Sequence, residues 1–145
     1  MNKAVLRCVI GFDFGLKRIG LATGQTITGT ATPLATVRAV NHRPDWESIA
    51  AHIEQWKPDA LIVGIPYLLD GSESDITRAA RNFSRSLEQR FHLPVYTIDE
   101  SLSSYAAESQ LKQDIKIDKH NKHEVDKMAA AIIVQSWLDS QQDRK

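Results

Sequence analysis

The stretch Val9-Ile10-Gly11-Phe12-Asp13-Phe14-Gly15-Leu16-Lys17-Arg18-Ile19-Gly20-Leu21-Ala22 places a carboxylate at the end of an otherwise apolar run, just before a turn. The residues before Asp13 are mostly apolar without strict alternation, as expected for a strand covered on both faces. Gly15 and Gly20 bracket the next four residues, so the pattern predicts a turn and a second strand from Ile19 to Thr23. Asp13 would then lie at the mouth of a hairpin.

Asp13 needs a physical explanation, because Asp is depleted in strands and a buried carboxylate without a partner costs several kcal/mol. Backbone amides of the turn, a Lys or Arg side chain, or a bound cation would each compensate for it. The simplest alternative is an aspartate that caps the turn through its own backbone. The acidic residues farther along the chain favour a more specific role.

The composition limits the protein class. The chain has 145 residues, with 18 Lys plus Arg against 18 Asp plus Glu, so net charge gives no argument for a nucleic-acid or membrane partner. We expect one domain, with disorder only in the tail from about Ser140. The only cysteine, Cys8, fits a reducing cytoplasm. The N-terminus does not read as a signal peptide, and no stretch approaches a membrane span.

The remaining chain alternates strand and helix signals. Predicted strands cover Thr28 to Ala39, Ala60 to Ile65 and Leu93 to Ile98, and Pro33 favours an edge or a bulge in the first of them. Predicted helices start with Asp45 as an N-cap and end at Pro58, follow the polar loop at 70–74, run from about Leu102 to Gln113, and begin again near Asn121. The residues from Gln113 to Lys122 are expected to form a polar surface loop.

Two further carboxylates occupy positions like that of Asp13. Glu100 lies just past a predicted strand, after Asp99, which should point to the opposite side of that strand and is a weaker candidate. Asp126 lies one turn into the last helix, on the face that also carries Ala130 and Ile133 and therefore packs inward. The three acids can converge at one edge of a sheet.

Clustered carboxylates repel one another unless they are protonated or bridged by a cation. Oxygen ligands favour Mg²⁺ or Mn²⁺ over Zn²⁺, and the sequence has no Cys or His spacing of the structural zinc type. Sites of this kind hydrolyse phosphodiester bonds by activating water and stabilising the leaving oxygen. We therefore expect Asp13, Glu100 and Asp126 to be catalytic and to hold one or two hard metal ions.

Four motifs, taken in order, resemble those of the YqgF (RuvX) family of RNase H-like proteins. They are Ile10 to Ala22, Val63 to Ser72, Asp99-Glu100 and Val125 to Ala130. Family members are described as Holliday junction resolvases and as pre-16S rRNA nucleases. The resemblance covers roughly residues 7 to 138 with the motifs in the right order, and four motifs together are far more specific than any one of them.

The resemblance implies an α/β fold, with a five-stranded mixed sheet of three antiparallel N-terminal strands plus two parallel strands and helices on both faces. It also implies that Asp13, Glu100 and Asp126 are the metal-binding catalytic acids. The family usually carries an arginine directly after the Asp-Glu pair, where this chain has Ser101. Another cation would have to serve the substrate phosphate, or activity would be reduced.

Basic residues near these motifs are candidates for contacts with the nucleic-acid backbone. One helix carries three arginines on its outer face, for which a solvated surface is an equally good explanation. The complete set is Lys17, Arg18, Arg78, Arg81, Arg85, Lys116, Lys119 and Lys122.

Other interpretations stay open at this stage. The first hairpin also matches the phosphate-binding hairpin of actin-like and hexokinase-like ATPases, although 145 residues leave no room for their second lobe. A non-catalytic nucleic-acid-binding module on the same fold is the alternative from another class. The residues alone do not distinguish structured RNA from branched DNA as the substrate. They also do not distinguish a monomer from a homodimer.

Overall fold

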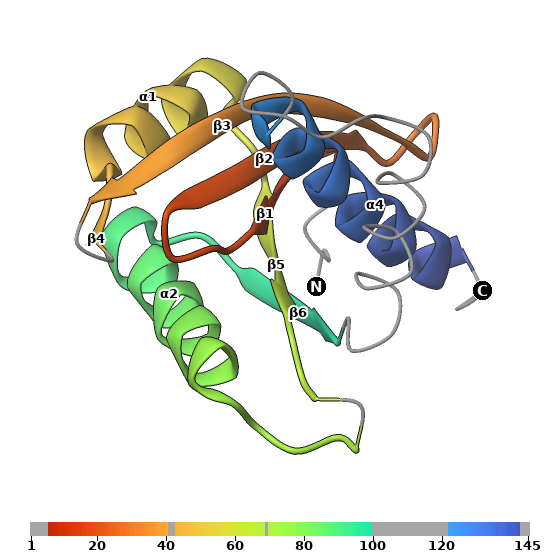
Figure 1. The fold of residues 1–145 in the computed structure, drawn as a ribbon. Coiled ribbons are helices and arrows are strands. Elements are labelled where there is room, and N and C mark those ends of the chain that lie inside the picture. Colours follow the sequence, from red (N-terminus) through yellow and green to blue (C-terminus); the bar gives the residue numbers. More distant parts are fainter. Residues whose placement is uncertain (1–5, 41–42, 69, 100–121, 143–145) are drawn as a thin grey trace.

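The computed structural model describes residues 6–40, 43–68, 70–99 and 122–142 (Figure 1). Its elements are β1 (Cys8–Asp13), β2 (Arg18–Gln25), β3 (Thr30–Val40), β4 (Arg43–Pro44), α1 (Trp46–Trp56), β5 (Ala60–Ile65), α2 (Asp75–Phe91), β6 (Val95–Asp99) and α4 (Lys122–Gln142). The predicted helix over residues 102–113 and nearly all of the following polar loop lie outside the described residues. None of the helices in these ranges is both long and apolar enough to cross a membrane.

The strands form one mixed sheet in the order β4-β3-β2-β1-β5-β6. The pairs β1–β2 and β2–β3 are antiparallel, whereas β1–β5 and β5–β6 are parallel. This confirms the predicted arrangement of three antiparallel and two parallel strands. The prediction of five strands was wrong by one, because the short β4 pairs with the end of β3. A two-residue strand is too short to leave a periodic signal in the sequence.

Strand β3 contains the irregularity that Pro33 predicted. Leu21 of β2 is opposite Ala35, but the next residue, Ala22, is opposite Pro33, so Leu34 is an extra residue in β3. A proline has no backbone N–H for the ladder, and bulges and edges are where sheets accept it. The bulge lies before the part of β3 that pairs with β4.

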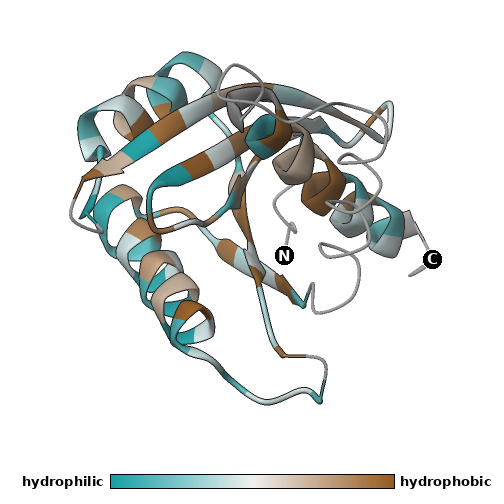
Figure 2. Ribbon diagram, viewed as in Figure 1, coloured by the Kyte–Doolittle hydropathy of each residue, from teal (hydrophilic) through white to brown (hydrophobic). Residues whose placement is uncertain are grey.

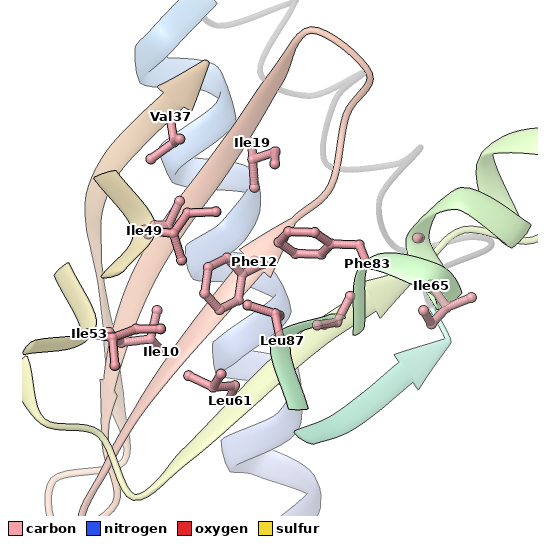
Figure 3. Packing of buried hydrophobic residues seen from close by; sticks show 13 residues of the cluster. Ile10, Phe12, Ile19, Val37, Ile49, Ile53, Leu61, Ile65, Phe83 and Leu87 are labelled. Atoms are coloured by element: carbon pink, nitrogen blue, oxygen red, sulfur yellow. The ribbon is translucent and has the colours of Figure 1, made fainter. Parts of the chain in front are cut away.

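Large apolar side chains cover one face of the sheet. Ile10 and Phe12 of β1 pack with Ile49 of α1 and with Phe83 and Leu87 of α2 (Figure 3). Burial of such side chains is the main favourable term in folding. Helix α2 combines hydrophobic and hydrophilic residues, as expected for a helix with one buried side (Figure 2).

Helix α4 covers the opposite face, where the strands carry small residues (Figure 1). A Cβ atom built on Gly11 or Gly24 would lie 2.1 or 2.5 Å from a methyl carbon of Val134. Ala130 of α4 is fully buried in the same cluster. The absence of strand side chains at these positions therefore lets α4 approach the sheet closely.

The helix ends follow local rules. The predicted N-cap Asp45 accepts a hydrogen bond from the backbone N–H of Ser48. The C-cap of α1 is Lys57, which has a left-handed conformation directly before Pro58. Helix α4 continues to Gln142, past Ser140, where we expected order to end.

Candidate active site

Asp13 is the last residue of β1 and lies on the face that α4 covers. Successive strand side chains alternate between faces, so Asp13 is on the same side as Gly11, which contacts α4. Its cross-strand neighbours are Gly20 in β2 and Gly64 in β5. The carboxylate is half-buried. The hairpin that the sequence predicted thus places it where β1 leaves the sheet.

Asp126 reaches the same place from α4. A Cβ atom built on Gly20 would lie 2.0 Å from the carbonyl oxygen of Asp126, so the helix backbone rests directly on this glycine. Gly20 is opposite Asp13, and opposed strand residues have their Cβ positions about 4.5 to 5.5 Å apart. The fold therefore brings Asp13 and Asp126 to neighbouring positions, although 112 residues separate them in the sequence.

Arg18 connects this site to the start of β2. Its Nε donates a hydrogen bond to Oδ2 of Asp126 at 2.7 Å, and the two side chains are 31% and 20% exposed. A charge-assisted hydrogen bond at this distance restricts the orientation of the carboxylate. The contact of Arg18 with nucleic acid stays a prediction, and in the structure its Nε donates a hydrogen bond to one of the predicted catalytic acids.

The third predicted acid, Glu100, lies outside the described residues. The preceding residue, Asp99, ends β6, and Ile98 is aligned with Gly64, which in turn is aligned with Asp13. Strands β1, β5 and β6 therefore end at one edge of the sheet. In the described ranges no group of three or more His, Cys, Asp or Glu side chains forms a metal site. The convergence of all three acids stays a prediction.

The donor chemistry of the two acids fits a hard divalent cation. Asp13 and Asp126 offer only carboxylate oxygens, the ligands that Mg²⁺ and Mn²⁺ prefer. Cys8, the only cysteine, lies at the other end of β1, where burial raises the pKa of its thiol. The charge of Arg18 offsets that of the Asp126 carboxylate, with which it forms an ion pair.

The predicted basic residues are distributed unevenly around the site. Lys17 is exposed in the turn between β1 and β2. Arg78 is paired with Asp75, and Nη1 of Arg85 donates to Asn82 at 3.5 Å, so these two arginines of α2 contact their own helix. Lys122 begins α4, and Lys116 and Lys119 lie outside the described residues.

Arg81 has a structural role that sequence analysis missed. Its Nη2 donates to the hydroxyl of Tyr67 at 2.9 Å, and its guanidinium also pairs with Glu73. The hydrogen bonds to Tyr67 and Glu73 raise the pKa of Arg81. These contacts fasten the loop after β5 to α2. The regular spacing of the helix arginines gave no sign that one of them faced this loop.

The loop after β5 is also ordered by its own polar residues. The hydroxyl and backbone N–H of Ser72 donate to Oδ1 of Asp70 at 2.6 and 2.9 Å, which lowers the pKa of the Asp70 carboxyl. Gly71 has φ of 85°, a left-handed conformation that side chains disfavour. The motif Asp70-Gly71-Ser72 is thus a turn that shapes the loop beside the strand ends.

Comparison with known sequences decides the family. The sequence model described as "RuvX: Holliday junction resolvase" matches residues 7–140. This chain belongs to the RuvX family. The predicted resemblance is confirmed, and with it the nuclease class to which the family is assigned.

Curated RuvX relatives match over nearly their full length. A protein of Hydrogenovibrio crunogenus is 49% identical over 141 residues, covering 97% of this chain and 99% of the relative. A protein of Pseudomonas aeruginosa (strain LESB58) is 42% identical over 138 residues, covering 95% and 96%. Both are named "Putative pre-16S rRNA nuclease".

Solved structures confirm the α/β, RNase H-like fold of this RuvX family member. Thermus thermophilus RuvC, determined in complex with a Holliday junction substrate, superposes with a TM-score of 0.55 at 15% identity and covers 94% of this chain and 96% of RuvC. Fowlpox virus resolvase, in complex with Holliday junction DNA, gives a TM-score of 0.55 at 16% identity, covering 92% and 98%. At these identities the likeness establishes the fold alone.

Proposed function

We propose that this protein is a divalent-metal-dependent endonuclease that processes the 5′ end of pre-16S rRNA. The observation that carries the proposal is the meeting of Asp13 and Asp126 across Gly20, at the edge where β1 and β6 end. The close approach of the Asp126 backbone to Gly20, opposite Asp13, supports the proposal that the two acids act together. The names of relatives that are 42–49% identical supply the substrate.

Mg²⁺ or Mn²⁺ would be held by Asp13 and Asp126 together with Glu100, the residue that follows β6. When bound, such an ion supplies an activated water and stabilises the departing oxygen of the phosphodiester. The sequence between Asp99 and the start of α4 contributes Lys116 and Lys119, and Lys122 begins the helix. These lysines, with Lys17, are the proposed contacts to the nucleic-acid backbone.

The residues of this chain set the geometry before any substrate arrives. Arg18 orients Asp126 through the hydrogen bond that its Nε donates to Oδ2 of the carboxylate. Lys17, one residue earlier and exposed, is positioned to meet a phosphate that approaches the edge. Two adjacent residues of the hairpin therefore have different proposed roles: Arg18 positions Asp126, and Lys17 binds the substrate phosphate.

Branched DNA is the second candidate substrate. The family description and two structural neighbours concern Holliday junctions. A junction has two symmetric strands to cut, so this substrate would favour a homodimer, whereas RNA trimming does not need one. Monomer or homodimer, and the cytoplasmic location expected from the single cysteine, stay predictions.

Cleavage assays separate these possibilities. The protein is incubated with Mg²⁺ or Mn²⁺ and either a precursor 16S rRNA 5′ fragment or a four-way DNA junction. We expect metal-dependent cleavage of the RNA, reduced about a hundredfold or more by Asp13→Asn or Glu100→Gln. Asp59→Asn is the matched control, because it removes a carboxylate at the opposite edge of the sheet. Cleavage that survives in both site variants would refute the proposed function.

A further inference from the structure

A cleft of about 660 Å³ lies on the face of the sheet opposite α4, and nothing in the proposed catalytic chemistry uses it. It is formed where the turn after β1 meets β4, the start of α1, and α2 (Figure 1). Its aromatic and charged lining comes from Phe14, Leu16, Arg43, Trp46, Phe83 and Arg90. Phe14 directly follows Asp13, so the cleft begins one residue beyond the candidate active site.

The floor of the cleft is aromatic. The rings of Trp46 and Phe83 stack with their centroids 5.5 Å apart at an interplanar angle of 21°. The ring of Phe14 lies 5.0 Å from that of Phe83. At the rim, 41% of Leu16 is exposed, so its apolar side chain adds to the open apolar surface of the cleft. Flat apolar surfaces of this kind accept a nucleobase by stacking.

The wall of the cleft is cationic. The guanidinium of Arg90 lies 4.2 Å over the ring of Trp46, a stacked arrangement that restricts its motion while its N–H groups stay available in the guanidinium plane. Arg43 is exposed in β4 on the other side. None of the described residues that line the cleft is acidic. The lining therefore favours an anion that also has a flat apolar part.

We propose that this cleft binds one nucleotide of a single-stranded nucleic acid, with its phosphate at Arg43 and Arg90 and its base against Phe14 and Leu16. The proposal rests on the proposed nuclease function, since a strand crossing the sheet edge at Asp13 would continue past Phe14 into the cleft. An acidic peptide would satisfy the arginines but would leave the aromatic floor without a partner. The cleft thus holds the flank of the substrate and not the bond that is cut.

The test is fluorescence anisotropy with labelled single-stranded RNA, and DNA of the same sequence, of about ten nucleotides. EDTA is present, so that binding is measured apart from cleavage. Arg43→Gln and Arg90→Gln are compared with Arg7→Gln, which removes the same charge just before β1, at the opposite end of that strand. We expect each cleft variant to weaken binding about tenfold. The slope of log binding constant against log salt concentration should become shallower by about 0.7, the value for one phosphate contact to a single strand. Arg7→Gln should bind like wild type.

The outcomes distinguish this proposal from the nuclease itself. If the cleft variants bind like Arg7→Gln, the cleft does not bind a nucleotide. Metal-dependent cleavage by wild type would still support the proposed nuclease function. Displacement of the RNA by polyglutamate as readily as by unlabelled RNA would also overturn the cleft, because the aromatic floor would then add nothing. Wild type that binds neither strand would also overturn the cleft, and the cleavage assay would still decide the nuclease separately. Arg43→Gln alone is decisive if Arg90→Gln lowers stability, because Arg43 is exposed.

Discussion

The two faces of the sheet perform different tasks with different side chains. On the α1 and α2 face, large residues such as Phe12 and Leu87 fill a continuous core. On the α4 face, Gly11, Gly20 and Gly24 leave no side chain between strand and helix. The first face supplies stability through buried area, whereas the second sets a distance, and that distance brings Asp126 beside Asp13. The position of Asp126 at the site therefore depends on the absence of side chains at these three glycines.

Leu87→Ala should have the largest effect on stability. Leu87 is fully buried in the core of the first face, and removal of its side chain leaves a cavity that we expect to cost about 3 kcal/mol in free energy of unfolding. Urea denaturation measures the loss. Because α2 lies on the other face from α4, the variant should keep wild-type cleavage per folded molecule, and a lower rate would show that the faces are not separate.

Gly20→Ala should have the next largest effect on stability and should mainly impair the candidate active site. The new Cβ would lie 2.0 Å from the backbone of Asp126, so α4 must shift, and we expect a loss of about 2 kcal/mol with a large loss of cleavage. Gly71→Ala is the control without a steric clash, because nothing lies within 4 Å of the added atom, so any loss there comes from its positive φ and not from a displaced helix. A Gly20→Ala variant that cuts as fast as wild type would contradict the role of close approach.

Arg18→Met should have a smaller effect. The ion pair with Asp126 is partly exposed, so we expect a loss of about 1 kcal/mol without divalent metal. A double-mutant cycle with Asp126→Asn, followed by urea denaturation, isolates the pair. The two losses should be less than additive, and simple additivity would mean that the 2.7 Å contact contributes nothing.

The smallest effect should come from Asp59, which lies just before β5, at the opposite end of the strands from Asp13. The backbone N–H groups of Arg7 and Cys8 donate to its carboxylate and lower its pKa. Because the folded pKa is below the usual value near 3.9, this contribution is present above that value and lost as pH falls through the folded pKa. Urea midpoints of wild type and Asp59→Asn should therefore converge at acid pH, and a constant difference would contradict the assignment.

The sequence predicted most of the sheet because its signals were local. Apolar runs, the glycines around Leu16 to Arg18, and Pro33 identified the strands, the hairpin and the bulge, whose physical causes lie within a few residues. Strand β4 could not be predicted, because it depends on the return of the chain after β3. The glycines of β1 and β2 could have indicated the close approach of a helix, since Gly20 and Gly24 share one side of a strand.

The site was predictable only in part. Asp13 and Asp126 were identified because a carboxylate in an apolar element is unusual, and in the structure they lie on either side of Gly20, while their catalytic role stays a prediction. The pairing of Arg18 with Asp126 was not predictable, since it joins residues 108 positions apart through the docking of α4. The cleft of Trp46 and Arg90 likewise depends on two helices meeting.

The most direct test of the central claim, that Asp13 and Asp126 form one metal site, is thermal unfolding with and without Mn²⁺. An ion that binds only the folded state raises the melting temperature by mass action, by an amount equivalent to about 2.7 kcal/mol at a hundred times its dissociation constant. We predict that Mn²⁺ stabilises wild type and Asp59→Asn equally and that Asp13→Asn and Asp126→Asn each lose most of this gain. If both site variants are stabilised by Mn²⁺ as much as wild type, the two carboxylates do not form a metal site.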